Sequence, residues 1–307
     1  MKKVAILAAA LSVAVAGQAS AELVYALTGN LFATSLVKFD SANPGVVTTV
    51  GTIGTGVRAN HSVRAIDFRP ATGELYAVSA GPSSGGLAPL QVYKVDLLTA
   101  VFSPVGNTFN VTAPDVRVSM DFNPTVDRIR IVTGNDQNLR AHPDTGALVS
   151  ADTNLAYVSG DVNFGQNNFV SDVAYTKNRV GGGPTTMYVF DYLVNSLATV
   201  GGIGGTPSPN TGQMNTVANI DPLAFFPDDS GMGLDVSGAT DIAYISYRQN
   251  GKEEIGTIDL GTGAVTSLGQ FPSGVDILDI SVAVVVPEPT ALAGVVLGGA
   301  ALLRRRK

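Results

Sequence analysis

Residues 63–79 read VRAIDFRPATGELYAVS. Two short runs rich in β-branched and aromatic residues flank the turn signal Pro-x-Thr-Gly, and this arrangement is typical of a hairpin of two strands. The next stretch, LQVYKVDLLTAVFSPVG at 90–106, has the pattern of two further strands. We therefore expect one unit of four short strands between residues 63 and 106.

The same unit returns along the chain. Its further copies are VSMDFNPTVDRIRIVTG (118–134) with NLRAHPDTGALVS (138–150), SDVAYTKN (171–178) with TTMYVFDYLVNSLATVG (185–201), and GLDVSGATDIAYISY (233–247) with EIGTIDLGTGAVTSLG (254–269). In most copies the first strand has the pattern apolar-Asp-apolar, and the second strand carries an aromatic residue or an isoleucine. All-β units repeated at intervals of about 50 residues predict the blades of a β-propeller.

The two ends of the repeat region each hold an incomplete unit. LVYALTG (23–29), LVKFDSA (36–42) and VVTTVG (46–51) match strands two to four, whereas VDILDISVAVV (275–285) matches a first strand alone. Joined, they make one whole unit, so we expect pairing of the N- and C-terminal strands to close a ring of five four-stranded blades, which leaves few exposed sheet edges. The segments 151–170 and 202–230 leave six or seven blades open as alternatives.

Composition limits the classes of protein and of partner. The chain has no cysteine, which excludes a disulfide framework. Residues 22–286 contain 13 Lys+Arg and 24 Asp+Glu, a balance of −11, and 20 of these acids are Asp, which favours turns over helices. No part of this region shows sustained helical periodicity. A body this acidic argues against nucleic acid and anionic lipid as partners.

The first 21 residues have the layout of a secretory signal peptide. Lys2 and Lys3 form a basic start, residues 4–16 form an apolar core, and Ala19 and Ala21 provide a small-x-small cleavage site. We expect signal peptidase to cut after Ala21, so that the chain is exported and its mature part begins at residue 22.

The last 21 residues, 287–307, have a different three-part layout. Pro287, Glu288 and Pro289 precede a short apolar run at 290–303 and a basic end at 304–307. Fourteen residues make a helix of about 21 Å, which is short for a bilayer core of about 30 Å. This order of parts resembles the PEP-CTERM sorting signal of exopolysaccharide-producing Gram-negative bacteria. The resemblance implies transient insertion of a transmembrane helix in the inner membrane, removal of the tail by an exosortase, and delivery to the cell surface or the extracellular matrix.

The region between the two signals also resembles a known family. The elements AIDFRPATGELYAV, DFNPTVDRIRIV, NLRAHPDTGAL and LDVSGATDIAY are similar to domain-of-unknown-function family 4394, a secreted, bacterial, repeat-built family. The resemblance runs over most of residues 23–285. It implies the repeat fold for the propeller domain at 22–286, and it implies no activity.

An aspartate recurs in the predicted first strands. Asp67, Asp121, Asp235 and Asp279 occupy the pattern apolar-Asp-apolar, and the remaining unit has Ala174 instead. Four carboxylates on channel-lining strands could converge on a hard cation such as Ca²⁺. Alternatively, each could accept backbone N–H groups at the hairpin that follows it. Because a residue that recurs in every blade usually builds the blade, we expect the structural role and predict no resident cofactor.

The sequence offers little else for catalysis. His61 and His142 lie in unrelated turns, the adjacent Asp228 and Asp229 point apart in an extended chain, and no HExxH, GxSxG or Walker motif is present. We therefore expect a non-enzymatic propeller of the cell surface or matrix that binds polysaccharide or a matrix protein. The alternative is a Ca²⁺-dependent, lactonase-like hydrolase with its site at the channel mouth.

Overall fold

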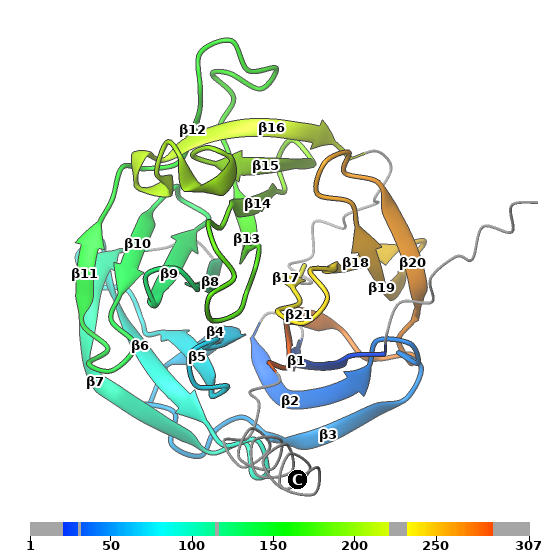
Figure 1. Cartoon of the computed structure of the whole chain (residues 1–307). Helices are drawn as coiled ribbons and strands as arrows, with labels where there is room; N and C mark the ends of the chain where they lie inside the picture. Colours follow the sequence, from blue (N-terminus) through cyan, green and yellow to red (C-terminus); the bar gives the residue numbers. More distant parts are fainter. Residues whose placement is uncertain (1–20, 30–31, 114–116, 221–231, 285–307) are drawn as a thin grey trace, which may run out of the picture.

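The fold is a five-bladed β-propeller whose inner strands surround one axis (Figure 1). The computed structural model describes residues 21–29, 32–113, 117–220 and 232–284. Each blade has four antiparallel strands, and the first of them is the one nearest the axis. The fold class predicted from the repeats is confirmed, with five blades.

The strands of each blade follow one another along the chain, except in the blade that joins the two ends. Blade 1 is β21 (Ile277–Val282), β1 (Leu23–Gly29), β2 (Ala33–Asp40) and β3 (Val47–Thr52). Blade 2 is β4 (Ser62–Phe68), β5 (Leu75–Ala80), β6 (Leu87–Val95) and β7 (Phe102–Thr112). Blade 3 is β8 (Val118–Asn123), β9 (Arg128–Thr133), β10 (Asn138–Ala141) and β11 (Leu148–Ala151). Blade 4 is β13 (Val170–Tyr175), β14 (Met187–Asp191), β15 (Ser196–Val200) and β16 (Gln213–Asn219), with β12 (Ala156–Tyr157) beside β16. Blade 5 is β17 (Leu234–Val236), β18 (Ala243–Gln249), β19 (Lys252–Ile258) and β20 (Val265–Gln270).

The predicted closure of the ring is present. β21 pairs antiparallel with β1, and Val24 lies opposite Val282 while Ala26 lies opposite Ile280. These side chains are buried because blades 5 and 1 pack against each other there. The C-terminal strand therefore completes the blade that the N-terminal strands begin.

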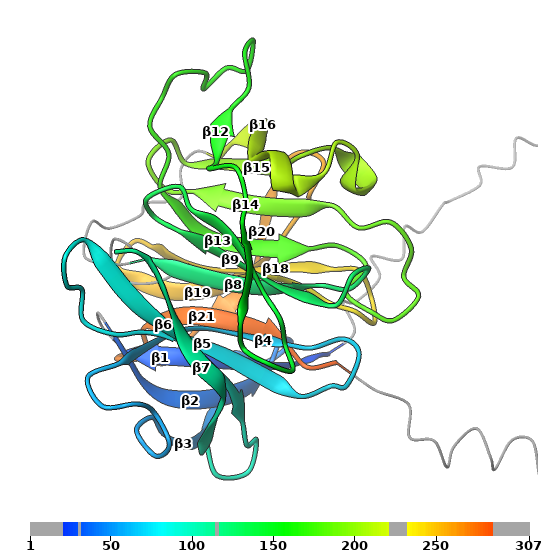
Figure 2. The same cartoon turned by 90° about the vertical axis from the view of Figure 1, so that its left-hand side faces the viewer.

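The two segments that left six or seven blades open form no further blade in the described residues. Within 151–170 the only added strand is β12, which extends blade 4 in parallel with β16. Within the described part of 202–230, two short 3-10 turns, η1 (Ile203–Gly205) and η2 (Pro209–Thr211), precede β16, the outer strand of the same blade. The loop between β12 and β13 projects outward from the ring in both views (Figures 1 and 2).

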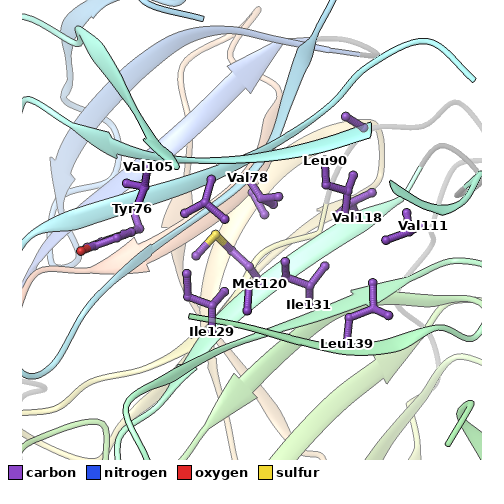
Figure 3. Packing of buried hydrophobic residues seen from close by; sticks show 14 of the residues in the cluster. Tyr76, Val78, Leu90, Val105, Val111, Val118, Met120, Ile129, Ile131 and Leu139 are labelled. Atoms are coloured by element: carbon purple, nitrogen blue, oxygen red, sulfur yellow. The ribbon is translucent and has the colours of Figure 1, made fainter. Parts of the chain in front are cut away.

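Apolar side chains from neighbouring blades pack against each other and hold the blades together. Between blades 2 and 3, Tyr76 and Val78 face Met120 and Ile129 (Figure 3). The ring of Tyr76 meets that of Phe122 edge to face, with centroids 5.1 Å apart. Burial of one such side chain stabilises the fold by about 1.5–3 kcal/mol. This packing fixes the inner strands side by side around the axis, and those strands carry the recurring aspartates.

Candidate functional site

Five aspartates, one from each inner strand, lie at the axis. Each of them is at most 4% exposed; they are Asp67, Asp121, Asp172, Asp235 and Asp279. Four of these had been predicted from the sequence pattern. Asp172 had not, because its repeat was aligned on Ala174, two residues later in β13. Side chains on alternate residues of a strand share one face, so both positions face the axis.

Hydrogen bonds between blades sort these positions into two levels. Asp67 Oδ2 accepts the N–H of Phe122, 2.8 Å away, and Asp235 Oδ2 accepts that of Val282, 2.6 Å away. In each case the N–H belongs to the residue directly after one whose side chain faces the axis in another blade: Phe122 follows Asp121, and Val282 follows Ser281. Ring one, defined by this pattern, consists of Asp67, Asp121, Ala174, Asp235 and Ser281. Ring two lies two residues earlier on each strand and consists of Ala65, Ser119, Asp172, Gly233 and Asp279.

Asp279 therefore lies in ring two, where its Oδ2 accepts the N–H of Ile66 at 2.6 Å. The assumption that it is equivalent to Asp67 was wrong by two residues, because Ser281 takes that place in β21. Ser281 accepts a hydrogen bond from the next blade in the same way: its Oγ receives the N–H of Phe68 at 3.1 Å.

The carboxylates bridge blades. Asp67 Oδ1 accepts the N–H of Phe68 within its own strand, while Oδ2 binds Phe122 of the next blade. The sequence had suggested anchoring of the following hairpin, and the observed acceptor contacts are to inner strands instead. A hydrogen bond to an ionised group contributes about 1.5–3 kcal/mol. Whether these aspartates serve structure alone stays a prediction.

The shared burial of these acids alters their ionisation. Burial raises the pKa of Asp67 and that of Asp172 to about 7. Burial, followed by repulsion from neighbouring aspartates, also raises the pKa values of Asp121, Asp235 and Asp279 well above the ordinary range. Five carboxylates this close cannot all be charged without compensating positive charge.

A small cavity adjoins ring two, and we call it the channel mouth. Its lining includes the ring-two residues Ser119, Asp172 and Asp279, together with Arg64 and Arg117. Its volume is about 20 Å³. Because a single water needs roughly 10–15 Å³ by this measure, the cavity accommodates about one water or one ion.

A much larger groove lies between blades 3 and 4. It consists of two adjoining hollows of about 570 and 320 Å³. The two hollows have Asn123, Val126, Ser208 and Pro209 in common. The hairpin 123–127, the glycine-rich loop 179–185 and the turn segment 204–210 form its walls. Cavities of about 300–1,000 Å³ are of the size that binds small ligands.

Arginines line the smaller hollow. Arg128 and Arg130 come from β9 and Arg140 from β10. Arg130 is 3% exposed, and its Nε donates to the hydroxyl of Tyr175 at 3.1 Å. Its Nη1 donates to Asp152 at 2.8 Å, and the same carboxylate accepts two hydrogen bonds from Arg140. The buried carboxylate of Asp152 therefore offsets part of this positive charge, and Arg130 also donates to Asn138 and Asn210.

Sequence reasoning missed the groove. The arginines are spread over 128–140 and look unremarkable in an acidic chain. Only the pairing of β9 with β10, which places Arg130 opposite Arg140, brings two of them together. The alternation Arg-Ile-Arg at 128–130 was the available signal, because it places both arginines on one face of a strand.

The remaining predicted residues take other places. His61 Nδ1 lies 2.9 Å from Ser79 Oγ, and His142 Nδ1 accepts the N–H of Asp144 within its own turn. Ala21 is exposed before β1. The other predicted processing and turn residues lie outside the described residues: Ala19, Asp228, Asp229, Pro287, Glu288 and Pro289. Across the described residues, no helix is long and apolar enough to cross a membrane, and the run 290–303 is not among them.

Comparisons with known proteins place the chain by family. The family model described as "Domain of unknown function (DUF4394)" matches residues 35–281. No curated protein matches the chain.

Similar solved structures share little sequence with it. The GH43_1 enzyme from Xanthomonas citri complexed with xylose has 10% identity and a TM-score of 0.48, over 83% of this chain and 88% of that one. A protein of unknown function from Bacteroides thetaiotaomicron has 15% identity and a TM-score of 0.46, over 87% and 68%. TolB from Acinetobacter baumannii has 12% identity and a TM-score of 0.44, over 86% and 67%. Similarities this weak transfer no activity.

Proposed function

This chain belongs to the DUF4394 family, and we propose that it is an exported, non-enzymatic propeller of the cell surface or extracellular matrix that binds exopolysaccharide. The signal peptidase and the exosortase are its expected processing partners, and the inner membrane is its expected transit site. The sequence layouts at 1–21 and 287–307 support this part of the proposal.

The observation that carries the binding function is the groove between blades 3 and 4. The half-buried side chains of Arg128, Arg140, Asn123 and Asn210 line the groove and provide polar groups for sugar hydroxyls. Val126 and Val149 provide apolar surface. Guanidinium groups pair well with the carboxylates of acidic sugars. The chemistry of the lining therefore favours a polysaccharide that carries acidic residues.

The same groove argues for binding rather than hydrolysis. Its described lining residues include no carboxylate and no histidine, whereas glycoside hydrolysis requires a pair of facing carboxyl groups. At the channel mouth, where the hydrolase alternative would place its site, the cavity of about 20 Å³ is far too small for a sugar ring.

Calorimetric titration of the mature protein, residues 22–286, with acidic and neutral polysaccharides tests the proposal. We expect saturable binding to acidic polysaccharide that weakens as salt is added. Val126→Glu should weaken it at least about tenfold, because a carboxylate in the groove repels the ligand and costs roughly 1.4 kcal/mol or more. Val126 is 54% exposed, so its replacement leaves the core intact.

Val162→Glu is the matched control. Val162 is also exposed, lies in the loop between β12 and β13, and does not line the groove. It should bind like the wild type. Equal binding by the two variants would show that the groove is not the binding site. Release of shortened sugar chains during the titration would show that the protein is a hydrolase.

A further inference from the structure

The three aspartates of ring one bring carboxylate oxygens together at the axis. One oxygen from each of Asp67, Asp121 and Asp235 lies within 4.8 Å of the other two. Ca²⁺ binds oxygens at about 2.3–2.6 Å, so two oxygens on one ion are at most about 4.6–5.2 Å apart. The spacing therefore fits joint coordination of a single ion.

Asp121 distinguishes this group from an acidic cluster whose oxygens are all in use. Its Oδ2 accepts the N–H of Tyr175, but its Oδ1 is buried and has no hydrogen-bond partner among the described residues. Asp67 and Asp235, by contrast, use both oxygens as acceptors of backbone N–H groups. A buried carboxylate oxygen without a partner costs free energy. A cation at the axis would supply the missing interaction.

We propose that Asp67, Asp121 and Asp235 bind one hard divalent cation at the propeller axis, with Ca²⁺ preferred. All three ligands are oxygens, and Ser281 Oγ, 3.3 Å from Asp235 Oδ2, adds a fourth oxygen at the same level. Hard cations prefer oxygen ligands, whereas Zn²⁺ prefers nitrogen and sulfur. This site is separate from the polysaccharide groove, and neither proposal depends on the other.

The preference for Ca²⁺ over Mg²⁺ follows from the irregularity of ring one. Its five positions hold three carboxylates, one hydroxyl and one alanine. Such a ring does not provide the six regularly placed oxygens of an octahedral site. Ca²⁺ accepts six to eight oxygens in flexible geometry, while Mg²⁺ demands a near-ideal octahedron at about 2.0–2.1 Å.

The small cavity adjoins ring two, on the same inner strands that carry this site. The cavity is lined by Asp172 and Asp279 of ring two, and ring one lies two residues deeper on the same strands. Once bound, the cation links the inner strands of blades 2, 3 and 5, and its expected effect is to stabilise the closed ring.

The test uses the mature protein freed of metal with EDTA and then titrated with Ca²⁺ or Mg²⁺ in a calorimeter. We expect one Ca²⁺ per chain and a higher melting temperature with Ca²⁺ bound. Asp121→Asn keeps an acceptor for Tyr175 but loses the charge, and it should weaken Ca²⁺ binding at least about tenfold, as changes at metal sites do. Asp235→Asn is a second variant with the same expected result.

Asp191→Asn is the matched control. Asp191 is also fully buried and accepts the N–H groups of Phe169 and Leu193, but it lies on β14, away from the axis. It should keep wild-type Ca²⁺ affinity even if it is less stable. Absence of bound calcium in the wild type, measured by elemental analysis after gel filtration, would overturn the proposal without any variant. Undiminished binding in Asp121→Asn would also overturn it, and equal or tighter Mg²⁺ binding would overturn the assignment to Ca²⁺.

Discussion

Asp172 and Asp279 are neighbouring acids within ring two. Their carboxyl groups hydrogen-bond to each other, and each also accepts a backbone N–H from the blade that follows. A hydrogen bond between two carboxyl groups requires that one of them hold a proton. The interface between these inner strands therefore depends on the protonation state of the pair.

This dependence predicts that stability falls as the pH rises from about 4 to about 7. Burial raises the pKa of Asp172 from the ordinary 3.8 to about 7. The folded state thus holds its proton more tightly than the unfolded state, so the resulting stabilisation is complete below about pH 4 and is lost as the pH rises through about 7. We expect the free energy of unfolding, measured by urea titration in EDTA, to fall between about pH 5 and about pH 8.

Asp172→Asn provides the comparison for this pH experiment. Asparagine can still accept the N–H of Leu234 but does not titrate, so the variant should show a flatter pH dependence. A wild type equally stable at both pH values would contradict the assignment, as would a variant whose stability falls by the same amount.

The sequence predicts a residue at the axis correctly where a recognisable turn follows it at a fixed distance. Asp67 and Asp121 each precede a Pro-containing turn at the same offset, so the pattern aligned them correctly. The strand of Asp172 is followed by a longer connection, 176–186. That repeat unit therefore lacks the short turn by which the others were aligned. No sequence signal distinguishes ring one from ring two, because that distinction arises only when neighbouring inner strands hydrogen-bond to each other.

At the scale of elements, strands joined by tight turns were predictable and the outer strand of blade 4 was not. β14 and β15 are joined by a short turn and appear in the repeat. β16 follows only after η1 and η2, because residues 201–212 hold glycines and prolines that interrupt the strand. The repeat pattern therefore ended one strand too early, although the number of blades was unaffected.

The element that closes the ring carries the next prediction. β21 covers the edge of β1, buries Ile280 and Val282, and brings Asp279 and Ser281 to the axis. A protein that ends at residue 273 loses all of these and exposes an unpaired strand edge. We expect it to aggregate or to melt at a much lower temperature, measured by calorimetry and size-exclusion chromatography.

A protein that ends at residue 284 is the control, because it keeps β21 and loses only the tail. It should melt like the longer mature form. If the shorter protein were as stable and as monodisperse as this control, β21 would not be the strand that holds the ring closed.

At the scale of the whole molecule, the ring concentrates opposite charges in different places. Carboxylates gather at the axis, while arginines from β9 and β10 gather in the groove between blades 3 and 4. The overall balance of −11 for residues 22–286 describes neither place. Composition could not predict an arginine-lined groove, because three segments well separated in the sequence form its walls.

The proposed function requires that the molecule bind its ligand in the groove between blades 3 and 4. The most direct measurement is hydrogen–deuterium exchange of the mature protein with and without acidic polysaccharide. We predict slower amide exchange in 123–127, 179–185 and 204–210, with little change at the inner strands around residues 63–65 and 117–119. Slower exchange confined to the channel mouth, or no change in the groove at a saturating polysaccharide concentration, would contradict it.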